Sequence, residues 1–425
     1  MKIGVLGAGY VGLTTAACLA HLGHDVTCAD VVPDKVDRLA DGDIPIVEEG
    51  LPELVRDGLD SGRLRFVLGE VAAVTDAEFV FLCVPTPQGD DGSADMSYIE
   101  KAAEAIGPHL DTDTIVVNKS TVPVGSTRVV ERALGRSDIA VVSNPEFLRE
   151  GTAVHDFLHP DRIVVGSEDN EAAIRMTELF AGIKAPFVVT DPPTAETIKY
   201  ASNAFLATKV SFINAVANLC EAVGANVREV VLGMGYDKRI GFEFLRPGPG
   251  WGGSCFPKDT HALVHIGEEA GYDFELLRGV IAVNEEQYER VAAKVRRMAG
   301  GDLEGRRIAV WGLTFKARTD DRRDSPAISV IRRLLAAGAT VTGYDPTVRA
   351  TMPEAPEVHI ATDPYDACAD AEVLVVLTEW DEFRWLDLGQ VRMRMAAARI
   401  VDARNLLEPA GARRAGFAYE GVGFA

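Results

Sequence analysis

The sequence has few cysteines and no long apolar run. Its six cysteines are scattered over 425 residues, with no CxxC pair and no spacing typical of a metal site. We therefore expect neither a disulfide framework nor a bound metal. No uncharged apolar stretch reaches the roughly 18 residues that a transmembrane helix needs, and the first residues do not resemble a secretory signal. These absences predict a cytoplasmic protein with no membrane partner.

Basic residues are also scarce relative to acidic ones. There are 43 Lys and Arg against 64 Asp and Glu, which gives a formal net charge of −21. Such an acidic surface excludes nucleic acid as an expected partner. A small anionic ligand stays possible, because a local basic pocket can lie on an acidic protein. At roughly 100–200 residues per domain, the length predicts two or three domains.

The first strand-like segment is followed by a glycine-rich turn. Residues Lys2–Leu6 read as a buried strand, GAGYVG follows at 7–12, and Leu13–Leu22 reads as an apolar helix. Asp25–Ala29 reads as the next strand. This order predicts a β-α-β unit with the dinucleotide fingerprint.

Each glycine of the fingerprint has its own physical reason. Gly7 permits the tight turn, Gly9 lets the backbone approach a pyrophosphate, and Gly12 lets the helix pack against the strand. The helix N-terminus then offers free N–H groups to the phosphates. Asp30, at the end of the second strand, can accept hydrogen bonds from a ribose diol and would repel a 2′-phosphate. The motif therefore predicts NAD rather than NADP.

Three further predicted strands each end in a polar junction. The strands are Phe79–Val84, Thr114–Asn118 and Ile139–Ser143, and the junctions are Pro85-Thr86-Pro87, Lys119-Ser120-Thr121-Val122-Pro123 and Asn144-Pro145-Glu146. Open α/β sheets bind ligands at the carboxyl ends of their strands. We therefore expect these junctions to line one site.

The pattern changes after residue 194. Ala195–Val223 has helical periodicity with no Pro or Gly, and its apolar character suits a dimer interface, although an ordinary core helix is the alternative. Beyond Gly300, strands are expected at Arg306–Trp311, Thr340–Tyr344, Val373–Leu377 and Arg399–Val401, with a helix at Pro326–Ala337. This predicts a second α/β domain without a GxGxxG motif.

The segment GPGWGGSCFPKD at 248–259 is dense in glycine and carries Cys255. Glycine at this density costs conformational entropy, which makes sense where backbone wraps closely around a ligand. Lys258 and backbone donors would stabilise a Cys255 thiolate. A buried cysteine in a tight loop is the alternative explanation.

Six blocks of the sequence together resemble one family. They are GAGYVG at 7–12, KSTVPVGS at 119–126, NPEFLREGTAVHDF at 144–157, ETIKYASNAFLATKVSFINAVANLCE at 196–221, GPGWGGSCFPKD at 248–259 and GLTFKARTDDRRDSP at 312–326. In this order they resemble the UDP-glucose/GDP-mannose dehydrogenase family, and within it the members that act on UDP-glucose. The matching positions run from Gly7 to Arg404, so nearly the whole chain is covered.

The resemblance implies an α/β enzyme in three parts. An NAD-binding Rossmann domain is expected at 1–194, a central long-helix dimerisation region with the cysteine loop at 195–299, and a UDP-binding Rossmann-like domain at 300–425. The implied reaction is the NAD-dependent, four-electron oxidation of UDP-glucose to UDP-glucuronate. Cys255 would carry first a thiohemiacetal and then a thioester. The implied assembly is a homodimer or a higher homo-oligomer.

The resemblance also implies a role for individual residues. Cys255 matches the nucleophile, Lys199 and Asn203 the pair around the reacting oxygen, Asp259 the carboxylate for proton transfer, and Glu146 with Thr121 the groups that assist hydrolysis. The implied cofactor contacts are Gly7, Gly9, Tyr10, Val11, Gly12, Asp30, Lys35, Thr86, Pro87, Thr121, Glu150, Lys258 and Arg323. The implied substrate contacts are Glu146, Phe147, Leu148, Glu150, Lys199, Asn203, Arg239, Phe244, Gly252, Phe315, Lys316 and Arg404, with Arg239 reaching across the dimer. Trp251 stands where the family commonly has a smaller aromatic residue.

Three other readings of the sequence stay open. A dehydrogenase of the same family could act on GDP-mannose or a UDP-N-acetylhexosamine, and only the resemblance of the stretches at 200–205 and 241–245 favours UDP-glucose. A different NAD dehydrogenase, such as a hydroxyacyl type, would need no cysteine. A nucleotide-sugar-binding regulatory protein would bind NAD without turnover, but Cys255, Lys199 and Asp259 are all retained.

Overall fold

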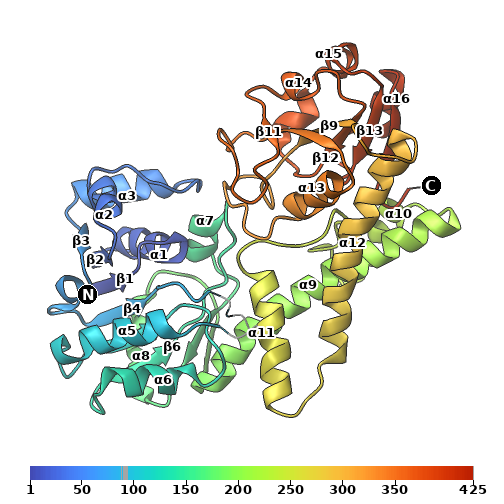
Figure 1. Cartoon of the computed structure of the whole chain (residues 1–425). Coiled ribbons are helices and arrows are strands. Elements are labelled where there is room, and N and C mark those ends of the chain that lie inside the picture. The colour runs from blue at the N-terminus through green and yellow to red at the C-terminus, as the bar shows by residue number, and fades with distance from the viewer. Residues whose placement is uncertain (88, 90–93, 425) are drawn as a thin grey trace. The chain divides into compact units, whose positions relative to one another are not determined.

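The computed structural model describes residues 1–87, 89 and 94–424, and it divides into two compact units. Unit 1 comprises Met1–Ser202 and His261–Gly271, and unit 2 comprises Asn203–Thr260 and Tyr272–Ala425 (Figure 1). Two of the three boundaries fall inside helices, namely α9 (Pro192–Val223) and α11 (Phe256–Glu269), and the third, after Gly271, follows the end of α11. The boundaries of the three expected parts stay a proposal.

Unit 1 is built on an eight-stranded sheet of order β3-β2-β1-β4-β5-β6-β7-β8. The six strands from β3 to β6 are parallel, and β7 pairs with β6 in the antiparallel sense. The strands are β1 (Lys2–Leu6), β2 (Asp25–Asp30), β3 (Leu64–Leu68), β4 (Phe79–Leu82), β5 (Ile115–Asn118), β6 (Ala140–Ser143), β7 (Ile163–Gly166) and β8 (Phe187–Thr190). The order 3-2-1-4-5-6 is that of a doubly wound dinucleotide-binding sheet, which confirms the predicted fold class.

Both faces of the middle of this sheet are buried, which explains why the central strand β4 (FVFL) is apolar at every position. In β4, Phe79 and Phe81 face one apolar cluster while Val80 and Leu82 face another. The first cluster contains α1 (Tyr10–His21), α3 (Leu51–Asp60), α7 (Ala153–Leu158) and α8 (Asn170–Leu179). The second contains α4 (Val71–Val74), α5 (Ser97–Ile106) and α6 (Ser126–Leu134). Figure 1 shows α5 and α6 on the opposite side of the sheet from α1 and α3.

Unit 2 holds an all-parallel, six-stranded sheet of order β11-β10-β9-β12-β13-β14. Its strands are β9 (Arg307–Trp311), β10 (Thr340–Tyr344), β11 (His359–Ile360), β12 (Val373–Val376), β13 (Arg399–Asp402) and β14 (Ala418–Gly421). This is again a Rossmann-like order, as expected. Ile308 and Val310 of β9 pack in one cluster, and Ala309 and Trp311 pack in the other.

The helices of unit 2 also lie in two layers. One cluster joins the sheet to the C-terminal part of α9, to α10 (Val227–Gly235), α12 (Glu275–Ala299) and α13 (Pro326–Ala336). The other includes α14 (Pro364–Ala367), α15 (Leu388–Arg394) and α16 (Pro409–Arg414). The cysteine-bearing loop runs from α10 to the start of α11, and its hydrogen bonds to Asn214 of α9 and Asn284 of α12 place it beside these two helices.

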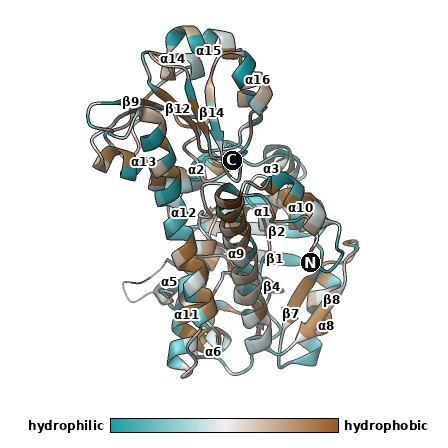
Figure 2. Ribbon diagram, turned by 90° about the vertical axis from the view of Figure 1, so that its right-hand side faces the viewer, coloured by the Kyte–Doolittle hydropathy of each residue, from teal (hydrophilic) through white to brown (hydrophobic). Residues whose placement is uncertain are grey.

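The long helix α9 begins three residues earlier than predicted, because Pro192 and Pro193 fit a first helical turn. Much of its length is apolar (Figure 2). Four of its large apolar side chains are exposed, namely Phe205, Phe212, Leu219 and Val223. In the part of the chain that the structure describes, none of the helices has the length and apolar character needed to span a bilayer.

Candidate functional site

The turn between β1 and α1 has the geometry that a pyrophosphate needs. A Cβ atom on Gly12 would lie 1.8 Å from the Gly7 carbonyl oxygen, so only glycine lets the helix approach the strand this closely. A Cβ on Gly9 would meet nothing within 4 Å, which leaves this backbone approachable. Gly9 caps α1 without a side-chain hydrogen bond. The first N–H groups of α1, at Tyr10 and Val11, are therefore suited to bind an anion.

Asp30 ends β2 beside this turn. Its carboxylate accepts a hydrogen bond from the Ala8 N–H at 2.9 Å and an ion-pair hydrogen bond from Lys35 Nζ at 2.7 Å. Burial alone would raise the pKa of Asp30, but the bonds from Lys35, Ala8 and Val32 outweigh it and lower that pKa. Asp30 is thus held as a carboxylate, the form that accepts hydrogen bonds from a ribose diol. The residues of this turn fit NAD.

The loops that follow β4 and β5 are bonded to each other. The Thr86 hydroxyl donates to the Thr121 carbonyl at 2.9 Å, and the Ser120 hydroxyl donates to the Val84 carbonyl at 2.7 Å. Thr121 is buried and Pro87 is exposed. The structure therefore brings together two of the three polar junctions expected from the sequence.

The third junction, after β6, pairs Glu146 with Lys199 of α9. Lys199 Nζ lies 2.9 Å from Glu146 Oε1 and 2.7 Å from the Glu146 carbonyl oxygen, and both side chains are buried. The Leu148 N–H donates to Glu146 Oε2 at 2.7 Å. Lys199 also lies over the ring of Phe147, 5.4 Å from its centroid. Glu146 and Lys199, which are buried, and Phe147 and Leu148, which are half-buried, are thus brought together.

The charges in this set determine how Glu146 titrates. Burial by itself would raise the pKa of Glu146, but the Lys199 ammonium, the Leu148 N–H and the nearby Lys119 ammonium outweigh it, and the pKa lies below its usual range. Lys119 is buried, and burial lowers its own pKa. Glu146 is therefore an ionised acceptor at neutral pH.

In unit 2, Cys255 immediately precedes α11, and its carbonyl accepts the Asp259 N–H at 2.9 Å. Its sulfur lies 3.6 Å from the Ser254 hydroxyl. One turn into the helix, the buried Asp259 carboxylate accepts from Asn203 Nδ2 at 2.6 Å and pairs with Lys258 Nζ at 2.6 Å. Four predicted residues, Cys255, Lys258, Asp259 and Asn203, therefore lie in one local arrangement.

The glycine-rich loop is anchored by polar side chains that the sequence did not single out. Asn284 of α12 accepts from the Trp251 N–H and donates to the Trp251 carbonyl, at 2.8 and 3.0 Å. The buried Trp251 indole N–H donates to the Ser211 hydroxyl at 2.8 Å. Gln287 donates to the Gly248 carbonyl, and Asn214 accepts from the Gly248 N–H, both at 2.8 Å. Trp251 thus belongs to the anchorage of the loop.

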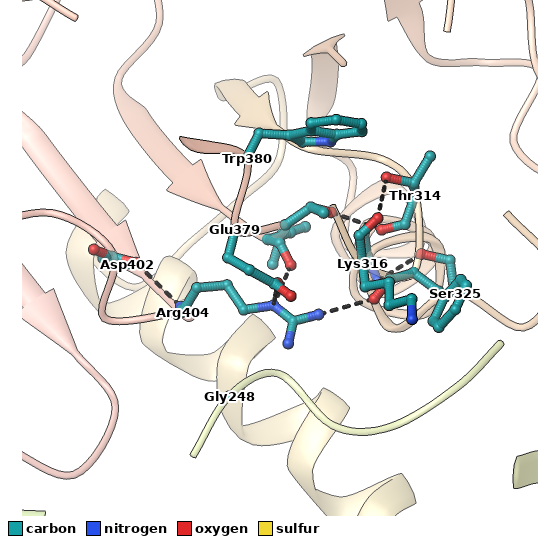
Figure 3. Close-up of polar contacts among 12 residues, drawn as sticks. Gly248, Thr314, Lys316, Ser325, Glu379, Trp380, Asp402 and Arg404 are labelled. Carbon is teal, nitrogen blue, oxygen red and sulfur yellow. Dashed lines mark hydrogen bonds and ion pairs between the residues drawn. The ribbon is translucent and has the colours of Figure 1, made fainter. Parts of the chain in front are cut away.

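Arg404 joins three loops at the carboxyl end of the second sheet (Figure 3). Its guanidinium donates to the carbonyls of Leu377 and Phe315 at 2.8 and 3.0 Å, and it pairs with Glu379 at 3.0 Å. A Cβ on Gly248 would lie 3.3 Å from the guanidinium, so the cysteine loop passes close to it.

The neighbours of Arg404 extend this arrangement toward the cysteine loop. Lys316 lies over the Phe315 ring, 5.4 Å from its centroid. A Cβ on Gly252 would lie 1.9 Å from the Asp324 carbonyl oxygen, so the loop packs directly against the segment after β9. Phe315, Lys316, Arg404 and Gly252 are thus brought together within unit 2.

Four other predicted residues are Arg239, Arg323, Phe244 and Glu150. Arg239 is exposed and forms a two-pronged pair with Asp237, and Arg323 does the same with Asp321. Phe244 packs near Phe256, with ring centroids 6.2 Å apart. Glu150 is half-buried. Among the described residues, no group of three or more His, Cys, Asp or Glu side chains is placed to hold a metal.

Comparison with known proteins decides the family. Three consecutive domain models of the UDP-glucose/GDP-mannose dehydrogenase family match this chain: the NAD-binding domain at residues 1–184, the central domain at 193–286 and the UDP-binding domain at 309–409. The chain belongs to the UDP-glucose/GDP-mannose dehydrogenase family. It is an NAD-dependent dehydrogenase, and the fingerprint described above lies within the segment that matches the NAD-binding domain, residues 1–184.

Individual relatives are similar over their full length. A UDP-glucose 6-dehydrogenase of Rhizobium meliloti (strain 1021) is 48% identical, and the match covers 100% of this chain and 99% of the relative. The solved structure of a UDP-glucose dehydrogenase from Pyrobaculum islandicum is 40% identical, with a TM-score of 0.91 and 100% and 98% coverage. A UDP-D-ManNAc dehydrogenase from Pyrococcus horikoshii is 28% identical, with a TM-score of 0.88 and 100% and 99% coverage.

Proposed function

We propose that this enzyme oxidises the C6 alcohol of UDP-glucose to the carboxylate of UDP-glucuronate. The full-length similarity to the Rhizobium meliloti and Pyrobaculum islandicum proteins supports this substrate. The observation that carries the chemistry is Cys255 at the start of α11, one helical turn before a buried Asp259. A helix N-terminus stabilises a thiolate, which is the nucleophilic form of cysteine. NAD, when bound, accepts the hydride in each of two oxidation steps.

In the proposed mechanism, one bond between the sugar carbon and the Cys255 sulfur forms and later breaks. The first oxidation converts the alcohol to an aldehyde. The thiolate adds to the aldehyde carbon, forming a C–S bond, and the alkoxide takes up a proton. Oxidation of this thiohemiacetal gives a thioester. Water then attacks the thioester carbon, the C–S bond breaks, and the acid and the thiolate are released. One sugar and one water are consumed, and two NAD molecules are reduced.

The residues around Cys255 and Glu146 supply the charges for these steps. We assign to Lys199 the stabilisation of the developing oxyanion, and to Asn203 a hydrogen bond to the same oxygen. The two lie four residues apart in α9, on one face of the helix. Asp259 handles proton transfer with a water molecule, and Glu146 with Thr121 assists hydrolysis. On the UDP side, we assign Phe315, Lys316 and Arg404 to the nucleotide, because a fork-shaped guanidinium suits a diphosphate.

A panel of nucleotide sugars tests the substrate. With NAD present, we expect NADH formation from UDP-glucose to exceed that from GDP-mannose, UDP-N-acetylglucosamine and UDP-N-acetylmannosamine by at least about 100-fold in kcat/KM, because a wrong group in a shaped pocket leaves polar groups unpaired. The Pyrococcus horikoshii neighbour makes the acetylated sugars the relevant competitors. Turnover of another sugar alone would preserve the chemistry and overturn the substrate.

We also propose that the protein acts as a homodimer, or a larger assembly of dimers, through α9. Support comes from its exposed apolar side chains: Phe205, Phe212 and Leu219 recur every seven residues and therefore lie along one face of the helix. A monomer rarely leaves such a stripe in water. The resemblance to the family implies that Arg239 contacts the substrate bound to the partner subunit. Catalysis would then require the dimer.

Placing a charge on this stripe should separate the subunits. We expect Phe212→Glu to yield monomers in sedimentation velocity, because a carboxylate at the centre of an apolar interface is costly to desolvate. Activity should fall in parallel, since Arg239 would lose its site. Ile174→Glu, at an exposed apolar position on α8, is the matched control. An active, unchanged assembly of Phe212→Glu would contradict the interface.

The absence of disulfides among the described cysteines bears on the compartment. All six cysteines lie in the described part of the chain, and none of them is in a disulfide there. A reactive thiol is best preserved where glutathione and thioredoxin keep cysteines reduced. We therefore place the enzyme in the cytoplasm.

A further inference from the structure

A buried carboxylate outside the assigned residues connects the cofactor turn to the substrate loop. Glu48 lies in the segment before α3 and is buried. It accepts hydrogen bonds from the Gly151 N–H at 2.6 Å, from the Ala153 N–H at 2.7 Å and from the Tyr10 hydroxyl. The Tyr10 hydroxyl itself accepts from the Gly151 N–H at 2.8 Å.

The two ends of this connection lie at the expected binding sites of two different ligands. Tyr10 is the first residue of α1 and directly follows Gly9, where the pyrophosphate of NAD is expected. Gly151 lies near the end of the loop that begins at Glu146, and Ala153, the first residue of α7, directly follows that loop. This loop, residues 146–152, carries the proposed substrate contacts and is called the substrate loop below. Glu48 is separated from both ends by at least 38 positions along the chain, so tertiary structure alone creates the connection.

We propose that Glu48 is a positioning residue through which bound NAD orders the substrate loop. Phosphate contacts at the start of α1 restrain Tyr10. Tyr10 restrains the Glu48 carboxylate, and the carboxylate restrains the two backbone N–H groups of the loop. The loop then holds Glu146, which in turn holds Lys199. This inference rests on the proposed function for the identity of the sugar, but its cofactor side depends only on NAD.

The chemistry of the connection requires a carboxylate. Three donors converge on its two oxygens: Oε1 accepts from Ala153, and Oε2 accepts from Gly151 and Tyr10. A glutamine has one acceptor oxygen and one NH₂ donor. In either orientation its NH₂ group would face a backbone N–H, and at least one loop bond would be lost. Glu48→Gln is therefore a nearly isosteric way to break the connection.

Hydrogen exchange tests the coupling directly. In the wild type, saturating NADH should slow exchange both in the turn at 7–12 and in the substrate loop. In Glu48→Gln, protection of the turn should persist while the NADH-dependent protection of the loop is lost. Glu53→Gln, an exposed acid in the next helix, is the matched control and should behave as the wild type. Equal loop protection in Glu48→Gln would overturn the proposal.

A binding measurement expresses the same coupling as the ratio of the UDP-glucose dissociation constants without and with NADH. We expect saturating NADH to tighten UDP-glucose binding by about tenfold in the wild type, and by a factor near one in Glu48→Gln. Should Glu48→Gln fail to fold, Tyr10→Phe breaks the same connection while keeping the backbone bonds to Glu48. Its control is Tyr98→Phe, at an exposed tyrosine on α5.

The hydrogen-exchange and binding measurements together distinguish a wrong substrate from a wrong role for Glu48. If the wild type does not bind UDP-glucose but NADH still protects the loop through Glu48, the substrate is wrong and the positioning role stands. If both variants keep full loop protection and full coupling, Glu48 only stabilises the fold.

Discussion

Replacing Cys255 by alanine is expected to abolish uronic acid formation, with the rate of the complete oxidation falling by about 10⁴-fold or more. Without the thiolate, the aldehyde has no covalent trap, and no thioester can form for water to hydrolyse. The wild type should yield two NADH per sugar consumed. The variant should yield at most one, together with free aldehyde that a carbonyl reagent can capture.

The other cysteines provide the control. Cys220→Ala, at a buried position in the α9 layer, should retain the stoichiometry of two. Three unrelated thiols are also chemically quiet, because burial raises the pKa of Cys18, Cys83 and Cys368 to about 12. Of the six cysteines, all of which the structure describes, five are buried and Cys255 is half-buried. Alkylation at neutral pH should therefore modify Cys255 first and inactivate the enzyme in proportion.

Two results would reject the covalent route. A Cys255→Ser enzyme that makes uronic acid at close to the wild-type rate would show that no thioester is needed. A wild-type yield of one NADH per sugar would mean that the aldehyde is released, and the reaction would then be a two-electron oxidation.

The sequence predicted the elements that carry strong local signals. β1 lies at Lys2–Leu6 and β10 at Thr340–Tyr344, as predicted. β1 is a short, mostly apolar run and β10 is rich in β-branched and aromatic residues, and turn residues follow both. β7 and β8 were not predicted. They are four-residue strands at the far edge of the sheet, and the β-pairing of β7 with β6 is limited to one residue pair, Ser143 and Gly166. Such edges are determined by tertiary packing more than by local pattern.

The same distinction applies to the site. Gly12 and Cys255 stand in motifs whose spacing has a chemical reason, so the sequence could identify them. Glu48 could not be found this way, because its partners lie 38 to 105 positions away. A weaker signal did exist for the loop anchors: Asn284 and Gln287 are polar residues three apart on the buried face of α12. Buried amides usually have partners, and here the partner is the glycine-rich loop.

Replacing Lys199 by methionine should damage both stability and catalysis. The buried Glu146 carboxylate would lose its closest cation, and breaking such a pair from one side typically costs about 3–5 kcal/mol. Lys119 also attracts Glu146 and would offset part of this cost. Loss of the proposed oxyanion contact should lower kcat by about 10²–10³-fold. Lys184→Met, at an exposed lysine, is the control for both measurements.

The pH dependence of unfolding follows from the direction of the Glu146 shift. In the wild type the pKa of Glu146 is lowered by folding, so its contribution to stability is present above the unfolded pKa of about 4.3 and is lost as the pH falls through the folded value. In Lys199→Met, burial still raises the pKa of Glu146, but the Lys199 ammonium no longer lowers it. The pKa of Glu146 therefore rises. The folded variant then takes up a proton at a higher pH than the unfolded chain does. The free energy of unfolding of this variant should therefore fall furthest below the wild-type value near pH 8, and less far below it near pH 5.

A second substitution separates the two effects of Lys199. Lys199→Met combined with Glu146→Gln removes the uncompensated carboxylate, so the free energy of unfolding should recover toward the wild-type value and lose its added pH dependence. The activity should not recover, because neither the cation nor the carboxylate is restored. Denaturant unfolding at both pH values and steady-state kinetics measure these outcomes independently. If kcat recovered along with stability, Lys199 would serve only to neutralise Glu146, and its assignment to the reacting oxygen would be wrong.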